Sequence, residues 1–96
     1  MTRPEISEAL SKLSPYQCQR LLIRLAFELT ILARGDLIER DLSTARRVND
    51  AIHRLLGLLQ SGMQHFEPDS TALIVATVDG LRIGSLLDNL LLELRA

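Results

Sequence analysis

The stretch DLIERDLSTARRVNDAIHRLLGLLQSGM, Asp36 to Met63, decides the fold that we expect for this chain. Its apolar residues recur at steps of four and three residues, with Asn49 at the one polar position of the row: Ile38, Leu42, Ala45, Ile52, Leu56, Leu59 and Met63. This spacing is typical of a helix that packs one side against another helix. If Asn49 is buried there, it would fix register and oligomeric state, whereas at the edge of the row it would be solvated, and both readings stay open.

Helix-start signals stand before this row and at its beginning. Ser14 and Gln17 flank Pro15 in a capping-box pattern, which predicts a helix from there to about Arg34. This helix is apolar around most of its circumference, as expected of a central or interface helix. The next helix begins at Leu37 after Asp36, or at Leu42 after Asp41, and runs to about Ser61.

Two further helices are expected at the ends of the chain. A short one spans 4–13, with Thr2 as its cap and an apolar stripe that would cover the larger helices: Ile6, Ala9, Leu10 and Leu13. The last one spans 71 to about 94 and carries a second row of apolar or small residues at three- and four-residue steps: Leu73, Ala76, Gly80, Ile83, Leu87, Leu90 and Leu94.

A β-hairpin is the competing interpretation of residues 72–87. The segment Ile74-Val75-Ala76-Thr77-Val78 is rich in β-branched residues, and Asp79-Gly80 is a strong two-residue turn signal. The segment 74–83 resembles the hairpin of roadblock-type domains, and this resemblance implies an α+β fold. Because the unbroken row of apolar residues favours a helix, we expect an all-α fold, with the C-terminal hairpin as the alternative.

Size and composition narrow the fold and the location. Ninety-six residues make one domain, 1–96, and the apolar residues are mainly leucine, as in helix packing. We therefore expect a small antiparallel bundle of three long helices and a short N-terminal helix. A single cysteine and a polar N-terminus favour the cytoplasm, and charges interrupt every window long enough to span a membrane.

A polar surface on the helix around Asn49 is the candidate site for chemistry. Its members are Arg46, Asp50, His53 and Arg54. Asp50 and His53 stand at i,i+3, but two ligands do not make a metal site, and no further histidine lies at helical spacing. Cys18 is expected to be a core residue. No catalytic motif, cofactor motif or metal motif is present, so we expect no catalytic, cofactor-binding or metal-binding residues.

The expected function is protein association without catalysis, most simply as a homodimer. The reason is that two apolar rows and a nearly all-apolar second helix present more apolar surface than thin helices can bury among themselves. The predicted interface residues are Leu22, Phe27, Asn49, Ile83, Leu87 and Leu91. The alternative is a small-molecule sensor or enzyme with a polar site around Asp50, His53 and Arg54. Nucleic-acid binding through the arginines is not expected, because the net charge is -1.

Overall fold

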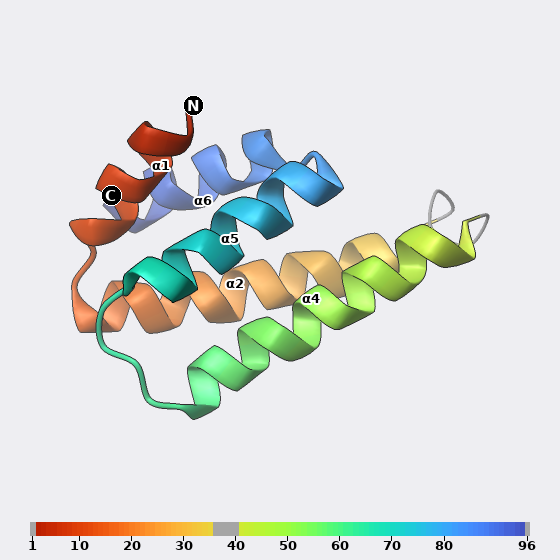
Figure 1. The fold of residues 1–96 in the computed structure, drawn as a ribbon, viewed down its shortest axis with the longest axis horizontal. Coiled ribbons are helices and arrows are strands. Elements are labelled where there is room, and N and C mark those ends of the chain that lie inside the picture. The colour runs from red at the N-terminus through yellow and green to blue at the C-terminus, as the bar shows by residue number, and fades with distance from the viewer. Residues whose placement is uncertain (1, 36–40, 96) are drawn as a thin grey trace.

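The computed structural model describes residues 2–35 and 41–95, and these residues form five helices and no strand. The helices are α1 (Arg3–Ser11), α2 (Pro15–Ala33), α4 (Leu42–Gln60), α5 (Pro68–Leu81) and α6 (Gly84–Arg95) (Figure 1). The expected all-α fold is confirmed. The hairpin alternative is wrong, because Asp79 and Gly80 lie inside α5.

α2 and α4 begin at the side-chain caps that the sequence predicts. The hydroxyl of Ser14 accepts the Gln17 N–H at 3.2 Å, and the Gln17 side chain accepts the Ser14 N–H at 2.9 Å, which completes the capping box of α2. Asp41 accepts the N–H groups of Ser43 and Thr44 at 3.0 and 3.3 Å, so α4 begins at Leu42. The alternative start at Leu37 after Asp36 lies outside the described residues.

The single long helix predicted for residues 71–94 is divided into α5 and α6. Arg82 adopts the left-handed conformation, with φ of 55° and ψ of 44°, and the chain turns there. Such a conformation costs a non-glycine residue about 1–2 kcal/mol. The turn lets α6 fold back and bury Leu87, Leu90 and Leu91, each of which contributes about 1.5–3 kcal/mol. The free energy gained by burying these leucines is therefore larger than the cost of the left-handed conformation at Arg82.

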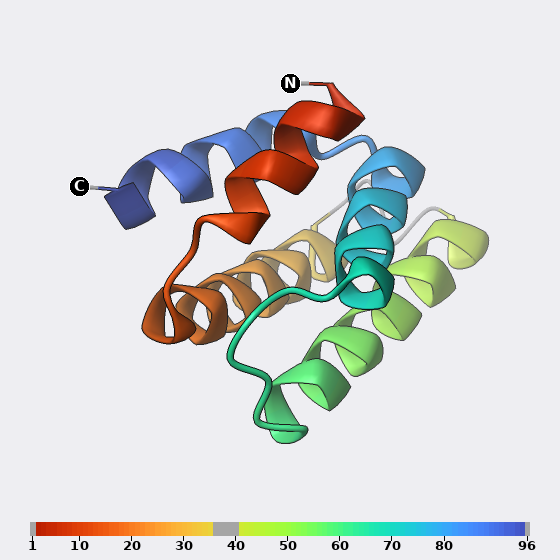
Figure 2. The same ribbon diagram turned by 60° about the vertical axis from the view of Figure 1, so that its left-hand side comes forward.

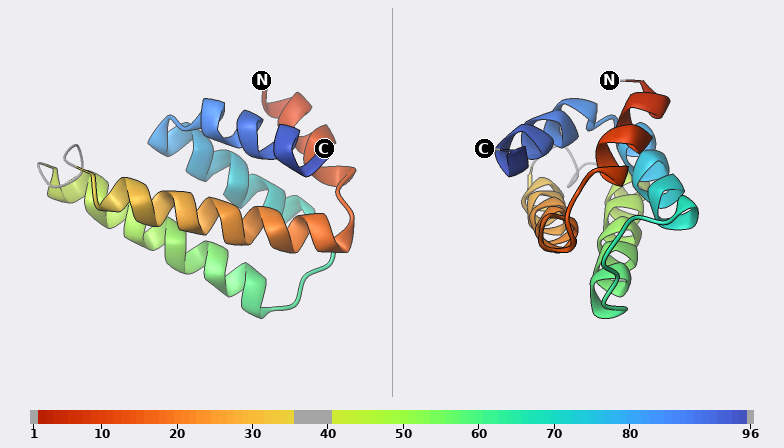
Figure 3. Two further views of the ribbon diagram at one scale, coloured as in Figure 1. Left: turned by 180° about the vertical axis from the view of Figure 1, so that it is seen from behind. Right: turned by 90° about the vertical axis from the view of Figure 1, so that its left-hand side faces the viewer.

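The helices surround one core, which an end-on view makes clear. α2 and α4 lie side by side and run in opposite directions, and this pair forms the most extensive contact (Figure 1). α6 packs on α2 and α5 packs on α4, while α1 lies across the space between α5 and α6 (Figures 2 and 3). None of the described helices has the length and apolar character that a membrane crossing requires.

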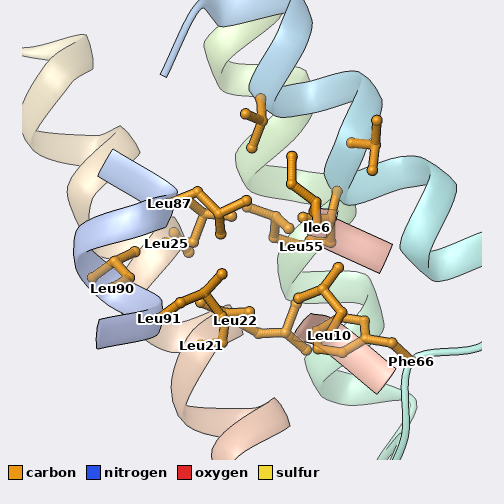
Figure 4. Packing of buried hydrophobic residues seen from close by; sticks show 14 of the residues in the cluster. Ile6, Leu10, Leu21, Leu22, Leu25, Leu55, Phe66, Leu87, Leu90 and Leu91 are labelled. Carbon is orange, nitrogen blue, oxygen red and sulfur yellow. The ribbon is translucent and has the colours of Figure 1, made fainter. Parts of the chain in front are cut away.

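Leucine dominates the core, and all five helices contribute to it. Figure 4 shows Leu21, Leu22 and Leu25 of α2 against Leu87 and Leu91 of α6. The predicted apolar stripe of α1 is confirmed, since Ile6, Ala9, Leu10 and Leu13 are all buried. The aromatic ring of Phe66, in the loop before α5, lies beside Leu10 in the same cluster (Figure 4).

The apolar row predicted for α4 is rotated relative to the inner face of the helix. The buried residues of α4 are Val48, Ala51 and Leu55, whereas Leu42 and Leu56 of the predicted row are 67% and 39% exposed. A straight helix has 3.6 residues per turn, so a strict heptad row drifts off the inner face. Asn49 is exposed, which agrees with the solvated reading. Ile38 lies outside the described residues.

Candidate interaction surface

The outer face of α2 carries four large apolar side chains in contact with solvent. Tyr16, Ile23, Phe27 and Ile31 are 70%, 52%, 59% and 51% exposed. With about 100° of rotation per residue, they fall within about 80° of the helix circumference, and Arg20 falls among them. We call these five residues the outer stripe of α2. In the left panel of Figure 3, α2 lies at the front along its length.

The opposite side of α2 is already occupied by the core of the same chain. Its buried residues are Cys18, Leu21, Leu22, Leu25, Ala26 and Leu29. The outer stripe therefore adds nothing to this core. The chain has one tyrosine and two phenylalanines, and Tyr16 and Phe27 lie in the stripe while Phe66 is buried. Aromatic side chains grouped on an exposed face are typical of an interaction surface.

Ion pairs form the border of the outer stripe on the side of α6. Arg24 contacts Glu28 at 3.7 Å along α2 and Glu93 of α6 at 3.1 Å. Two carboxylates face one guanidinium, so this cluster has a surplus of negative charge. Arg20 has no ion pair with another described residue. It lines a hollow together with Glu93, so Arg20 lies on the α6 side of the stripe.

The predicted interface residues have different positions in the structure. Phe27 and Asn49 are exposed and Ile83 is partly exposed. Leu22, Leu87 and Leu91 belong to the core of the chain, so they offer no surface to another molecule in this conformation. Sequence reasoning missed Tyr16, Ile23 and Ile31. The signal for them was present, because they fall on the side of the helix opposite Leu21, Leu25 and Leu29.

A groove between α4 and α5 is lined by only two of the four residues of the predicted polar surface. Asp50 and Arg54 line the groove, whose volume is about 200 Å³, while Arg46 and His53 are exposed but do not line it. Arg47, which was not among the predicted site residues, joins them. The groove is lined by Arg47, Asp50, Ala51 and Arg54 of α4 and by Leu73, Ala76, Thr77, Gly80 and Leu81 of α5.

Cys18 has the environment expected of a core cysteine. Its side chain is fully buried, and the thiol contacts the Leu13 carbonyl oxygen at 3.9 Å. Burial raises the pKa of this thiol. A buried thiol with a raised pKa is a poor nucleophile. Within 2–35 and 41–95, no group of three or more potential side-chain ligands has the geometry to hold a metal ion.

Comparison with known proteins adds no relative from which a role could be transferred. No protein-family model matches the chain, and no curated protein or solved structure is similar enough to match. A function for this chain must therefore be argued from its own surface.

Proposed function

We propose that the chain is a non-enzymatic association module that forms a homodimer through the outer stripe of α2. The observation that carries this proposal is the row of four large side chains, each at least half exposed, on a helix whose inner side is already buried. Contiguous apolar surface on a small protein commonly marks a site where another protein binds. A second copy is the simplest partner, because the net charge of -1 produces little repulsion between two copies.

The size of the stripe predicts a reversible dimer. Full burial of a large apolar side chain is worth about 1.5–3 kcal/mol, so half of this gain for eight side chains amounts to roughly 6–12 kcal/mol. The loss of rotational and translational freedom on association costs roughly 4–15 kcal/mol. These terms are comparable, and the core is complete in one chain. We therefore expect a folded monomer in equilibrium with a dimer, and not an obligate dimer.

Light scattering coupled to size-exclusion chromatography tests the proposal. We expect the mass to rise from 10.7 kDa toward twice that value as the protein concentration increases. Phe27→Gln places an amide in the stripe and should keep the mass at the monomer value. The matched control is Leu92→Gln on α6, because Leu92 is 62% exposed and lies outside the stripe. A wild-type mass of 10.7 kDa throughout the series would refute self-association.

The groove between α4 and α5 supports a second candidate function, the binding of a small carboxylate. Arg47 and Arg54 lie on either side of Asp50 along α4, and all three line the groove. The two guanidinium groups suit an anionic group of a ligand, while Leu73 and Leu81 suit its apolar part.

Thermal unfolding in the presence of hexanoate, a small carboxylate with an apolar chain, tests the second candidate. A bound ligand raises the melting temperature by mass action. We expect a rise for the wild type and for Arg46→Ala, because Arg46 does not line the groove, and no rise for Arg54→Ala. Equal shifts in all three proteins would show a general salt effect and remove this candidate.

A further inference from the structure

We propose that two copies pair α2 with α2 in opposite directions, about a two-fold axis near Ile23 and Arg24, so that each Arg20 lies over the partner's Phe27. This inference rests on the proposed self-association and specifies its geometry. The residues of the outer stripe are spaced symmetrically about this axis. In the same arrangement, the charges at the border of one copy are complementary to those of the other.

The spacing of the stripe determines the position of the axis. Tyr16 and Ile31 lie equally far from the midpoint between Ile23 and Arg24, and so do Arg20 and Phe27. In a two-fold interface, when one residue contacts a second residue of the partner, the second contacts the first in return. An antiparallel pair centred on this midpoint therefore places Tyr16 against the partner's Ile31 at both ends. Ile23 lies beside the partner's Ile23 at the centre.

Arg20 explains why this register suits the stripe better than a parallel one. In a parallel pair, each Arg20 would lie beside the partner's Arg20, and like charges would approach one another. The antiparallel axis brings the two copies of Arg24 near each other instead, but each of these is already paired with Glu28 and Glu93 of its own chain. In the antiparallel pair, the guanidinium of Arg20 instead lies over the partner's Phe27, where a cation is attracted to the face of an aromatic ring. Phe27 is 59% exposed in the single chain, so its ring is accessible for this contact.

The ion pairs at the border of the stripe add charge complementarity. Rotation about the axis keeps the α6 side of one copy next to the α6 side of the other, and Arg20 lies on that side. Arg20 then comes within one residue along the helix of the partner's Glu28. Glu28 belongs to the cluster in which two carboxylates share the guanidinium of Arg24. Arg20, which has no ion pair with the described residues of its own chain, thus meets the surplus negative charge of the partner.

Removal of the guanidinium tests the predicted contact. Arg20→Gln should weaken the dimer by roughly five- to thirtyfold, because two symmetric cation–ring contacts are lost. The matched control is Arg46→Gln, which removes the same charge from the exposed face of α4. Equal dissociation constants for the two variants would contradict the contact between Arg20 and the partner's Phe27.

Disulfide cross-linking tests the register. In the antiparallel pair, the two copies of residue 16 lie about 22 Å apart along the helix axis, well beyond the reach of a disulfide of about 4–7 Å between Cα atoms. A mixture of Tyr16→Cys and Ile31→Cys should therefore cross-link 16 to 31, and neither variant should cross-link to itself. Wild type is the control, because Cys18 is fully buried.

The outcomes separate this inference from the proposed function. Cross-linking of Tyr16→Cys to itself, with a dimer mass for the wild type, would overturn the antiparallel register and leave self-association in place. A dimer mass with no cross-link in the mixture would show that the stripe is not the contact surface, which would overturn the register and its location. A monomer mass for the wild type would overturn both proposals.

Discussion

The outer faces of α2 and α4 differ although the two helices have the same length and pack against each other. Each helix has 19 residues. The outer face of α2 carries the apolar stripe, while the outer face of α4 carries Arg46, Asn49 and His53, with exposed leucines toward its two ends. On α4, the buried apolar residues lie on the side that faces the core. On α2, apolar residues lie on both sides, and those of the outer side do not contribute to the core of a single chain.

The largest effect that we predict contrasts the two sides of α2. Leu25→Ala removes a fully buried side chain and should lower the free energy of unfolding by about 2–5 kcal/mol. Ile23→Ala removes a half-exposed one and should change it by less than about 0.5 kcal/mol. Denaturant unfolding at a concentration where the chain is monomeric measures both. If the two values are similar, the division of α2 into inner and outer sides is wrong.

The next prediction makes α4 more like α2. Asn49 lies seven residues from both Leu42 and Leu56, which are partly or largely exposed. Asn49→Leu completes an apolar row on this face, outside the outer stripe of α2, and should add a second association surface, so that species larger than the dimer form, with about 1.5–3 kcal/mol for each added side chain that is buried. Sedimentation or light scattering measures the change.

A leucine added at an exposed position with polar neighbours is the control for this prediction. Ser11→Leu places a leucine at the end of α1, where Ser7 and Glu8, one turn earlier, are exposed. It should leave the mass equal to that of the wild type at every concentration. An equal rise in mass for Asn49→Leu and Ser11→Leu would mean that added leucine surface acts without regard to position.

The smallest predicted effect concerns the start of α4. A hydrogen bond from the Thr44 hydroxyl, together with the backbone N–H groups that cap the helix, lowers the pKa of Asp41. A lowered pKa contributes stability above the ordinary carboxyl pKa of about 3.9, and this contribution is lost as the pH falls through the pKa of the folded state. Asp41→Asn keeps a capping oxygen without titrating. Its stability should therefore fall less than that of the wild type between pH 5 and acid pH, and identical pH profiles would contradict this account.

The sequence predicted the helices well because their start signals are local. The capping box at Ser14 and the cap at Asp41 involve neighbours within three residues, and both are present in the structure. The division of the last helix could not be predicted in this way. Arg82 is an unfavourable residue for a left-handed turn, and the turn is stabilised by contacts of α6 with distant parts of the chain.

The candidate site was harder to predict than the fold for a related reason. Apolar residues all around α2 indicated excess hydrophobic surface but not which side the core would take. Leu22, Leu87 and Leu91 were therefore expected at an interface, although they lie in the core. Phe27 was identified and is exposed. Only the packing of α4 and α6 against the Leu21 and Leu25 side of α2 assigns the opposite side to the surface.

The contacts between the two ends of the chain have a consequence for its biosynthesis. Arg3 binds Asp79 at 2.7 Å, and the side chain of Gln17 donates to the carbonyl of Leu94 at 3.0 Å. These partners are 76 and 77 residues apart, so α1 and α2 leave the ribosome well before the helices that they contact. α2 therefore emerges with both of its apolar sides uncovered. The core closes only once α6 has been synthesised, so the buried side of α2 stays exposed to solvent until then.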